Sequence, residues 1–243
     1  MRFNEVSIMV YGGFSTIGRM HIQTGLPNQD AFRSAKIPEG YIAVVSDGLG
    51  SCRKSKIGSW LLVTSALYLA SSHEIGHISV DDFAQKLTEI WEKRINRIGY
   101  PLYECCATAL FAIYLKKKNA VWLGRLGDGA VTLLTKEIAI TLSDTKEDGF
   151  INIVSGCLGS NNVSWNLYEL KEANPKAAFL WTDGISDSID KNEIQEIAIG
   201  LYEEYYQKNL QEIQLDCAKW VPELPGHDDK TIAYWLVGET GHE

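Results

Sequence analysis

The sequence predicts an α+β fold in which antiparallel sheets are layered with helices. Two observations support this prediction. Strand-like runs dominate the middle and both ends of the chain, and the helical patterns between them come in pairs, so the regular alternation of a parallel sheet is missing. The chain has 243 residues, of which 45% are hydrophobic and 22% charged, as in ordinary globular proteins. We expect residues 1–243 to form a single domain with a sizeable core.

Hydrophobic periodicity and turn residues place the elements along the chain. Strand-like apolar runs lie at 6–11, 41–46, 107–115, 120–126, 130–135, 177–182 and 230–236. Helical patterns, in which apolar residues recur every three or four positions, lie at 56–72, 80–98, 191–206 and 210–218. We interpret 116–119 and 127–129 as hairpin turns and 143–165 as a loop. We expect the tryptophans, including Trp60, Trp91 and Trp122, to lie in the core.

Composition argues against several classes of protein. The chain carries 23 Lys plus Arg against 31 Asp plus Glu, a net charge of −8, whereas nucleic-acid binding needs a basic surface. Its longest apolar run, 60–70, is too short to cross a bilayer, and the first residues lack the long apolar segment of a signal peptide. The five scattered cysteines favour reduced thiols over disulfides or a zinc site. We therefore expect a soluble, cytoplasmic protein that binds neither nucleic acid nor membrane.

Acidic residues beside glycine or at strand ends form the main functional signal. They lie in five short motifs at 28–31, 46–51, 127–129, 182–187 and 227–231. Asp-Gly is also a common turn dipeptide, so any one motif alone could be a plain turn. However, Asp47 and Asp183 each follow an apolar strand-like run, and Asp228 precedes another. If these strands are neighbours, their carboxylates converge at one end of the sheets.

Converging carboxylates repel one another unless protons or a cation neutralise them. Ligand sets made of oxygen, without His or Cys, select hard ions such as Mg²⁺ or Mn²⁺ over zinc. Two such ions sharing one carboxylate would lie about 3.5–4 Å apart, a geometry that activates water for in-line attack on phosphorus. The residues themselves therefore indicate a carboxylate metal site suited to phosphate chemistry.

The motifs occur in the order Asn-Gln-Asp-Ala, Asp-Gly-x-Gly, Gly-Asp-Gly, Thr-Asp-Gly-Ile-x-Asp and Asp-Asp-x-Thr. Over about residues 11–235, this series resembles the metal-dependent protein phosphatases of the type 2C (PPM) family. The opening Gly-Arg-Met-His-Ile at 18–22, followed by Gln29-Asp30, is similar to the short bacterial version. The resemblance implies a four-layer α-β-β-α sandwich, in which two packed antiparallel sheets are flanked by helix pairs.

The resemblance also implies roles for individual residues. Asp47 matches the carboxylate that bridges two metal ions, and Gly48 matches the residue whose backbone carbonyl binds the second ion. Asp183 and Asp228 match the remaining carboxylates of the first ion. Asp30 matches the carboxylate that holds metal-bound water near the bridge.

A third, weaker metal site is found in many members of the family, and Asp128 and Asp187 match its positions. The implied cofactors are thus two or three Mn²⁺ or Mg²⁺ ions. Asp183 and Asp187 are four residues apart, which places them on one face if a helix begins at Gly184. Asp229 stands where the family often has Asn, and we assign it a supporting role behind the metal ligands.

The implied reaction is hydrolysis of phosphoserine or phosphothreonine in a protein substrate by a hydroxide that bridges the two metals. A cognate Ser/Thr kinase is a candidate partner. Many members grip the substrate phosphate with an Arg at the position of His21, and Arg19 lies two residues earlier, so either side chain is a candidate for that task. Leu49 stands where some relatives carry a His. Residues 143–165 replace the segment, called the flap, that is usual in the family.

Two other functions stay open at this stage. One is a weakly active or inactive family member that regulates by binding phosphopeptides or a kinase. The other is an unrelated carboxylate enzyme such as a glycosidase, which would need an acidic pair without metal.

Overall fold

The computed structural model describes residues 9–143 and 156–237, which contain two five-stranded antiparallel sheets. The first sheet has the order β1 (Met9–Thr16), β10 (Lys230–Val237), β9 (Pro175–Trp181), β6 (Ala130–Thr135), β7 (Ala139–Leu142). The second has the order β2 (Ala31–Ile37), β3 (Gly40–Ser46), β4 (Ala109–Leu115), β5 (Ala120–Leu126), β8 (Asn166–Lys171). Both ends of the described chain meet in the first sheet, because β1 pairs with β10 over their whole length.

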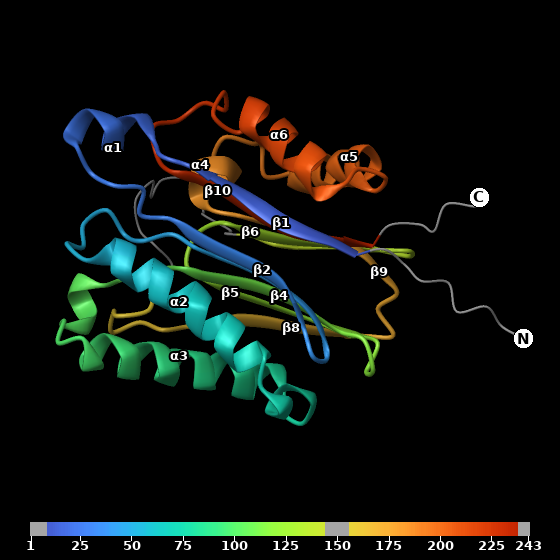
Figure 1. The fold of residues 1–243 in the computed structure, drawn as a ribbon, viewed down its shortest axis with the longest axis horizontal. Helices are drawn as coiled ribbons and strands as arrows, with labels where there is room; N and C mark the ends of the chain where they lie inside the picture. Colours follow the sequence, from blue (N-terminus) through green and yellow to red (C-terminus); the bar gives the residue numbers. More distant parts are fainter. Residues whose placement is uncertain (1–8, 144–155, 238–243) are drawn as a thin grey trace, which may run out of the picture.

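Helix pairs cover the outer faces of the two sheets (Figure 1). Helices α2 (Ser55–Ala70) and α3 (Val80–Arg97) pack on the β2–β8 sheet. Helices α5 (Ile194–Tyr205) and α6 (Leu210–Trp220) pack on the β1–β7 sheet. Short helices α1 (Arg19–Thr24) and α4 (Asp183–Ser186) lie at one end of the sandwich. The predicted α+β class and the four-layer arrangement are both confirmed.

Three apolar layers hold these four structural layers together. Neighbouring residues of one strand serve different layers, since successive side chains point to opposite faces of a sheet. Val44 packs toward α2 and α3, whereas Val45 packs against the other sheet. On the opposite side, Leu180 faces the layer between the sheets and Trp181 faces α5 and α6. This double burial explains why the central strands are continuously apolar in sequence.

The 127–129 segment is not the predicted hairpin turn. It connects β5 to β6, which belong to different sheets, so the chain crosses the sandwich there. Gly127 and Gly129 have φ values of 89° and 101°, which glycine adopts readily. The hairpin prediction failed because an Asp-Gly turn does not reveal in which sheet the next strand will pair. The predicted turn at 116–119 is confirmed, with Leu115 paired to Ala120.

Several elements were not predicted. These are α1, β2, β7 and β8, and β8 has mostly exposed side chains that carry little hydrophobic signal. Trp60 is 49% exposed, so its predicted core position is wrong, whereas Trp91 and Trp122 are fully buried. Trp60 lies with Tyr68 on the outward stripe of α2. Within the described residues, we find no helix with the length and apolar character needed to cross a membrane.

Candidate metal centre

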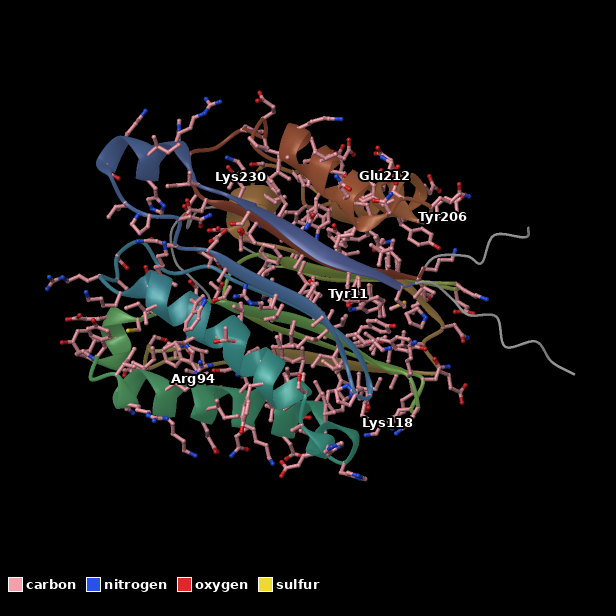
Figure 2. The ribbon with its side chains drawn as sticks, in the orientation of Figure 1. Tyr11, Arg94, Lys118, Tyr206, Glu212 and Lys230 are labelled. Atoms are coloured by element: carbon pink, nitrogen blue, oxygen red, sulfur yellow. The ribbon has the colours of Figure 1, made fainter. Side chains whose placement is uncertain are left out.

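Strand ends bring the acidic motifs to the end of the sandwich where α4 lies. Asp47 follows β3, Asp183 follows β9 and opens α4, and Asp228 comes shortly before β10. Asp30 precedes β2, and the pairing of Ala31 with Ser46 places it beside Asp47. Figure 2 marks this end by Lys230, while Lys118, in the β4–β5 turn, lies toward the opposite end. The four carboxylates are thus gathered from four different strands.

Burial and mutual repulsion dominate the electrostatics of this cluster. Burial raises the pKa of Asp47 well above its ordinary value, and the charges of Asp30, Asp228 and Asp229 raise it further. Burial likewise raises the pKa of Asp183 to about 8, with added repulsion from Asp47, Asp228, Asp187 and Asp128. Each carboxyl therefore lies within electrostatic reach of several others, and the cluster needs protons or cations to be stable at neutral pH.

Asp30 is a further member of the cluster, and its Oδ1 atom is buried. Its burial raises the pKa to about 7, and the nearby polar side chains of Asp47, Thr231 and Thr182 limit the rise. The contact with Asp47 brings two buried carboxyls within hydrogen-bonding reach of each other. Such a pair either shares a proton or binds a cation between its oxygens.

The chemistry of the donor set fits hard divalent cations. The Oδ1 atoms of Asp30 and Asp183 are buried and accept no hydrogen bond from any described residue. A buried carboxylate oxygen without a donor is costly unless another group, such as a metal ion, occupies that position. The central atoms available to bind a cation are carboxylate oxygens. Mg²⁺ and Mn²⁺ match such ligands better than zinc or copper do.

Threonine hydroxyl groups hold the backbone of Asp47 and the carboxylate of Asp30 in place. The Asp47 backbone N–H donates to Thr108 Oγ1 at 2.9 Å, and the Thr108 N–H donates back to the Asp47 carbonyl at 2.8 Å. Thr182 Oγ1 donates to Asp30 Oδ2 at 2.8 Å and accepts the N–H of Thr231 at 3.1 Å. Sequence reasoning did not identify these threonines. Thr182 directly precedes Asp183, and Thr231 closes the last acidic motif, so their positions offered a signal.

Gly48 lies in close contact with two neighbouring segments of the chain. A Cβ at this position would come within 2.7 Å of the Ser55 backbone and 2.9 Å of the Gln29 carbonyl oxygen, so a larger residue would not fit without movement. Gly48 also forms an isolated antiparallel bridge with Ala107. The backbone of Gly48 therefore lies beside the acidic cluster in a fixed position.

Asp183 and Asp187 line one cavity of about 250 Å³ between α4 and the 225–228 segment. The Asp187 N–H donates to the Asp183 carbonyl at 2.8 Å, as expected of residues four apart in a helical turn. Helix α4 begins at Asp183, one residue earlier than expected. Asp228 also lines this cavity, and Asp128, in the β5–β6 crossing, is buried and close enough to Asp183 to raise its pKa.

The two candidate phosphate-gripping residues lie in different environments. Arg19 is exposed at the start of α1. His21 is 7% exposed, and its Nδ1 atom lies 2.9 Å from Asp229 Oδ2. Ligand atoms of His21, Asp228 and Asp229 lie within 4.8 Å of one another. His21 thus belongs to the buried support of the acidic cluster, and Arg19 to its exposed surroundings.

Part of the 143–165 segment, residues 144–155, lies outside the described residues. Within the described part, Leu158 pairs with Ala107 in an antiparallel bridge. Because Ala107 also bridges Gly48, Ala107 lies between Leu158 and the loop that follows Asp47.

This two-sheet sandwich thus carries, at one end, a carboxylate cluster suited to binding divalent metal ions. A family model described as protein phosphatase 2C matches residues 17–216. The chain therefore belongs to the protein phosphatase 2C family, which confirms the resemblance found in the sequence. Among curated proteins, none matches this sequence.

Solved structures of bacterial phosphatases share the fold. The serine/threonine phosphatase of S. agalactiae superposes with a TM-score of 0.71 at 17% identity, covering 95% of this chain and 100% of that one. The serine/threonine phosphatase PstP/Ppp of Mycobacterium tuberculosis gives 0.69 at 16% identity, covering 95% and 99%. A catalytic domain of PstP in complex with two manganese ions gives 0.70 at 16% identity, covering 96% and 100%.

Proposed function

We propose that this protein hydrolyses phosphoserine or phosphothreonine in protein substrates, with two Mn²⁺ or Mg²⁺ ions held by its acidic cluster. The observation that carries the proposal is the convergence of Asp30, Asp47, Asp183 and Asp228 from four strand ends, with raised pKa values for the first three. Family membership and the manganese complex of the similar PstP domain support it.

In this proposal Asp47 would be a ligand shared by the two ions, Asp183 and Asp228 would complete the first site, and the backbone carbonyl of Gly48 would serve the second. Bound ions would lower the pKa of water from about 15.7 to about 7 and neutralise the phosphate oxygens. Asp30 is held by Thr182 through Oδ2, which leaves Oδ1 to orient the attacking water. Asp128 and Asp187 are the candidates for a third ion.

Exposed Arg19 is the stronger candidate for gripping the substrate phosphate, because a guanidinium can form a bidentate contact and His21 is buried against Asp229. The proposed partners are a phosphorylated protein and a cognate Ser/Thr kinase. The single domain over residues 1–243 and the cytoplasmic location also stay predictions.

The proposal is tested by hydrolysis of para-nitrophenyl phosphate and of a phosphothreonine peptide, with Mn²⁺ and with EDTA. We expect turnover that requires Mn²⁺ and falls about 100-fold or more in Asp47→Asn and in Asp183→Asn. Asp82→Asn is a matched control, since Asp82 accepts N–H and hydroxyl donors at the exposed start of α3. Activity that persists in EDTA would contradict the metal mechanism. Phosphopeptide binding without phosphate release would instead support the regulatory alternative.

A further inference from the structure

Asp229 connects two segments that are far apart in the sequence. Its carboxylate is 1% exposed and accepts three hydrogen bonds. Oδ1 accepts the backbone N–H of Gly18 at 2.7 Å, and Oδ2 accepts the N–H of Gln29 at 2.6 Å. Oδ2 also lies 2.9 Å from His21 Nδ1. Because a carboxylate oxygen accepts here, Nδ1 of His21 carries the proton.

The three residues that Asp229 contacts all belong to one segment, residues 18–29. Gly18 lies just before α1, His21 lies within it, and Gln29 directly precedes Asp30. A second set of contacts joins the same segments, because the Met20 N–H donates to the His227 carbonyl at 3.0 Å. A Cβ on Gly18 would collide with the backbone of residues 227–228. One carboxylate therefore fixes both ends of the 18–29 segment against the loop that carries Asp228.

Asp229 also contacts the surroundings of the acidic cluster at two points. Through the hydrogen bond to the Gln29 N–H, it fixes the backbone immediately before Asp30. Through its own N–H, which donates to Asp228 Oδ1 at 2.8 Å, it orients the Asp228 side chain. Asp229 thus contacts the backbone beside one functional carboxylate and the side chain of another.

An asparagine could not make the same contacts. Its amide has one acceptor oxygen and one NH₂ donor, and the NH₂ would face either the Gly18 N–H or the pair formed by His21 and Gln29. All three neighbours of the Asp229 carboxylate are donors, so the site needs an acceptor at both oxygens. An unpaired N–H in this buried position would be costly and would release one end of the 18–29 segment.

We propose that Asp229 is a positioning residue which, with His21, holds the 18–29 segment so that Asp30 and Asp228 are preorganised for divalent metal binding and hydrolysis. This inference rests on the proposed function and extends it to residues that do not contact the substrate. Groups that orient metal ligands typically change metal affinity or activity by 10–100-fold when they are replaced.

The test compares Asp229→Asn with the wild-type chain, using Mn²⁺ binding by titration calorimetry, kcat and KM for para-nitrophenyl phosphate, and thermal unfolding. We expect Mn²⁺ affinity and kcat to fall about 10-fold or more, with a smaller change in KM. At position 21, an asparagine side chain keeps an N–H donor near the position of His21 Nδ1, whereas a leucine side chain has no such donor. We therefore expect His21→Asn to retain more Mn²⁺ affinity than His21→Leu.

Asp82→Asn again serves as the control, because it removes a carboxylate acceptor remote from the metal centre and should leave Mn²⁺ affinity unchanged. A ¹⁵N NMR spectrum of labelled histidine gives a further readout, in which His21 should show a protonated Nδ1 that is lost in Asp229→Asn. An Asp229→Asn chain that is less stable but binds Mn²⁺ and turns over as the wild type does would overturn the inference. A wild-type chain without Mn²⁺-dependent hydrolysis would contradict the proposed function itself.

Discussion

Thr182 Oγ1 donates a hydrogen bond of 2.8 Å to Oδ2 of Asp30, although 152 positions separate the two residues in the chain. The contact joins the two sheets, because Thr182 follows β9 and Asp30 precedes β2. It leaves Oδ1 of Asp30 without a donor among the described residues, beside the Asp47 carboxyl. One buried hydroxyl therefore sets the direction in which a functional carboxylate faces.

Replacing Thr182 by Val should remove the hydrogen bond to Asp30 while keeping the side-chain shape. The variant leaves both Asp30 Oδ2 and the Thr231 N–H without their partner, so we expect the free energy of unfolding to fall by about 1–3 kcal/mol. We also expect lower kcat, since Asp30 loses its orientation. Urea unfolding and Mn²⁺-dependent turnover measure the two effects. Thr132→Val is the control: Thr132 is buried, and its hydroxyl pairs with Thr141 away from the acidic cluster, so it should lower stability without lowering kcat.

The metal-free protein should become less stable as the pH rises. The pKa values of Asp30 and Asp183 are about 7 and about 8 in the folded chain, against an ordinary value of 3.8. Between about pH 4 and pH 8 the folded chain therefore binds more protons than the unfolded chain, and the free energy of unfolding decreases with pH. Urea unfolding in EDTA across this range measures the effect. Stability that rises steadily from pH 5 to pH 8 in EDTA would contradict the raised pKa values.

Mn²⁺ should reverse that trend. Because the ions replace the protons on the carboxyls, their affinity should increase with pH, and a ligand that binds the folded state raises its stability by mass action. At Mn²⁺ concentrations 100-fold above the dissociation constant, the gain is about 2.7 kcal/mol for one site. Thermal unfolding with and without Mn²⁺ at pH 6 and pH 8 should show the larger increase in Tm at pH 8. An equal increase at both values would be evidence against competition with protons.

Asp47→Asn should stabilise the metal-free chain while abolishing its response to metal. The Asp47 carboxyl is buried and repelled by Asp30, Asp228 and Asp229, and an amide of the same shape removes that repulsion. At pH 8 in EDTA, we expect a gain of about 1–2 kcal/mol in the free energy of unfolding, as is common when functional strain is relieved. The Mn²⁺-dependent rise in Tm should shrink. A loss of stability in EDTA would indicate that the Asp47 carboxyl is structurally required.

Trp60 and Trp91 offer a direct test of which helix faces are buried. Trp91 is fully buried and donates a hydrogen bond from Nε1 to the Gly58 carbonyl at 2.9 Å, whereas Trp60 is 49% exposed. Trp91→Ala should cost about 3–5 kcal/mol and Trp60→Ala about 0.5 kcal/mol or less. Denaturant unfolding of both variants measures the difference. Similar losses would contradict the assigned orientation of α2.

Local patterns in the sequence were sufficient for much of the fold. Helix α3 was expected at 80–98 and extends from Val80 to Arg97, because its apolar residues repeat at helical spacing and acidic residues occupy its first turn. Strand β5 was expected at its observed bounds, since it lies between two clear turn signals. Strand β8 escaped prediction, because its side chains are mostly exposed and its hydrophobic pattern is correspondingly weak.

By itself, the sequence determined the identities and order of the acidic motifs, the long periodic helices and the buried central strands. These follow from local spacing and side-chain chemistry. Tertiary structure alone decided that 127–129 crosses between sheets, that Trp60 faces outward, and that Asp229 holds His21 and Gln29 while Thr182 holds Asp30. Each of these depends on strand register and layer packing between distant segments, and those long-range pairings leave no periodic trace in the residues that make them.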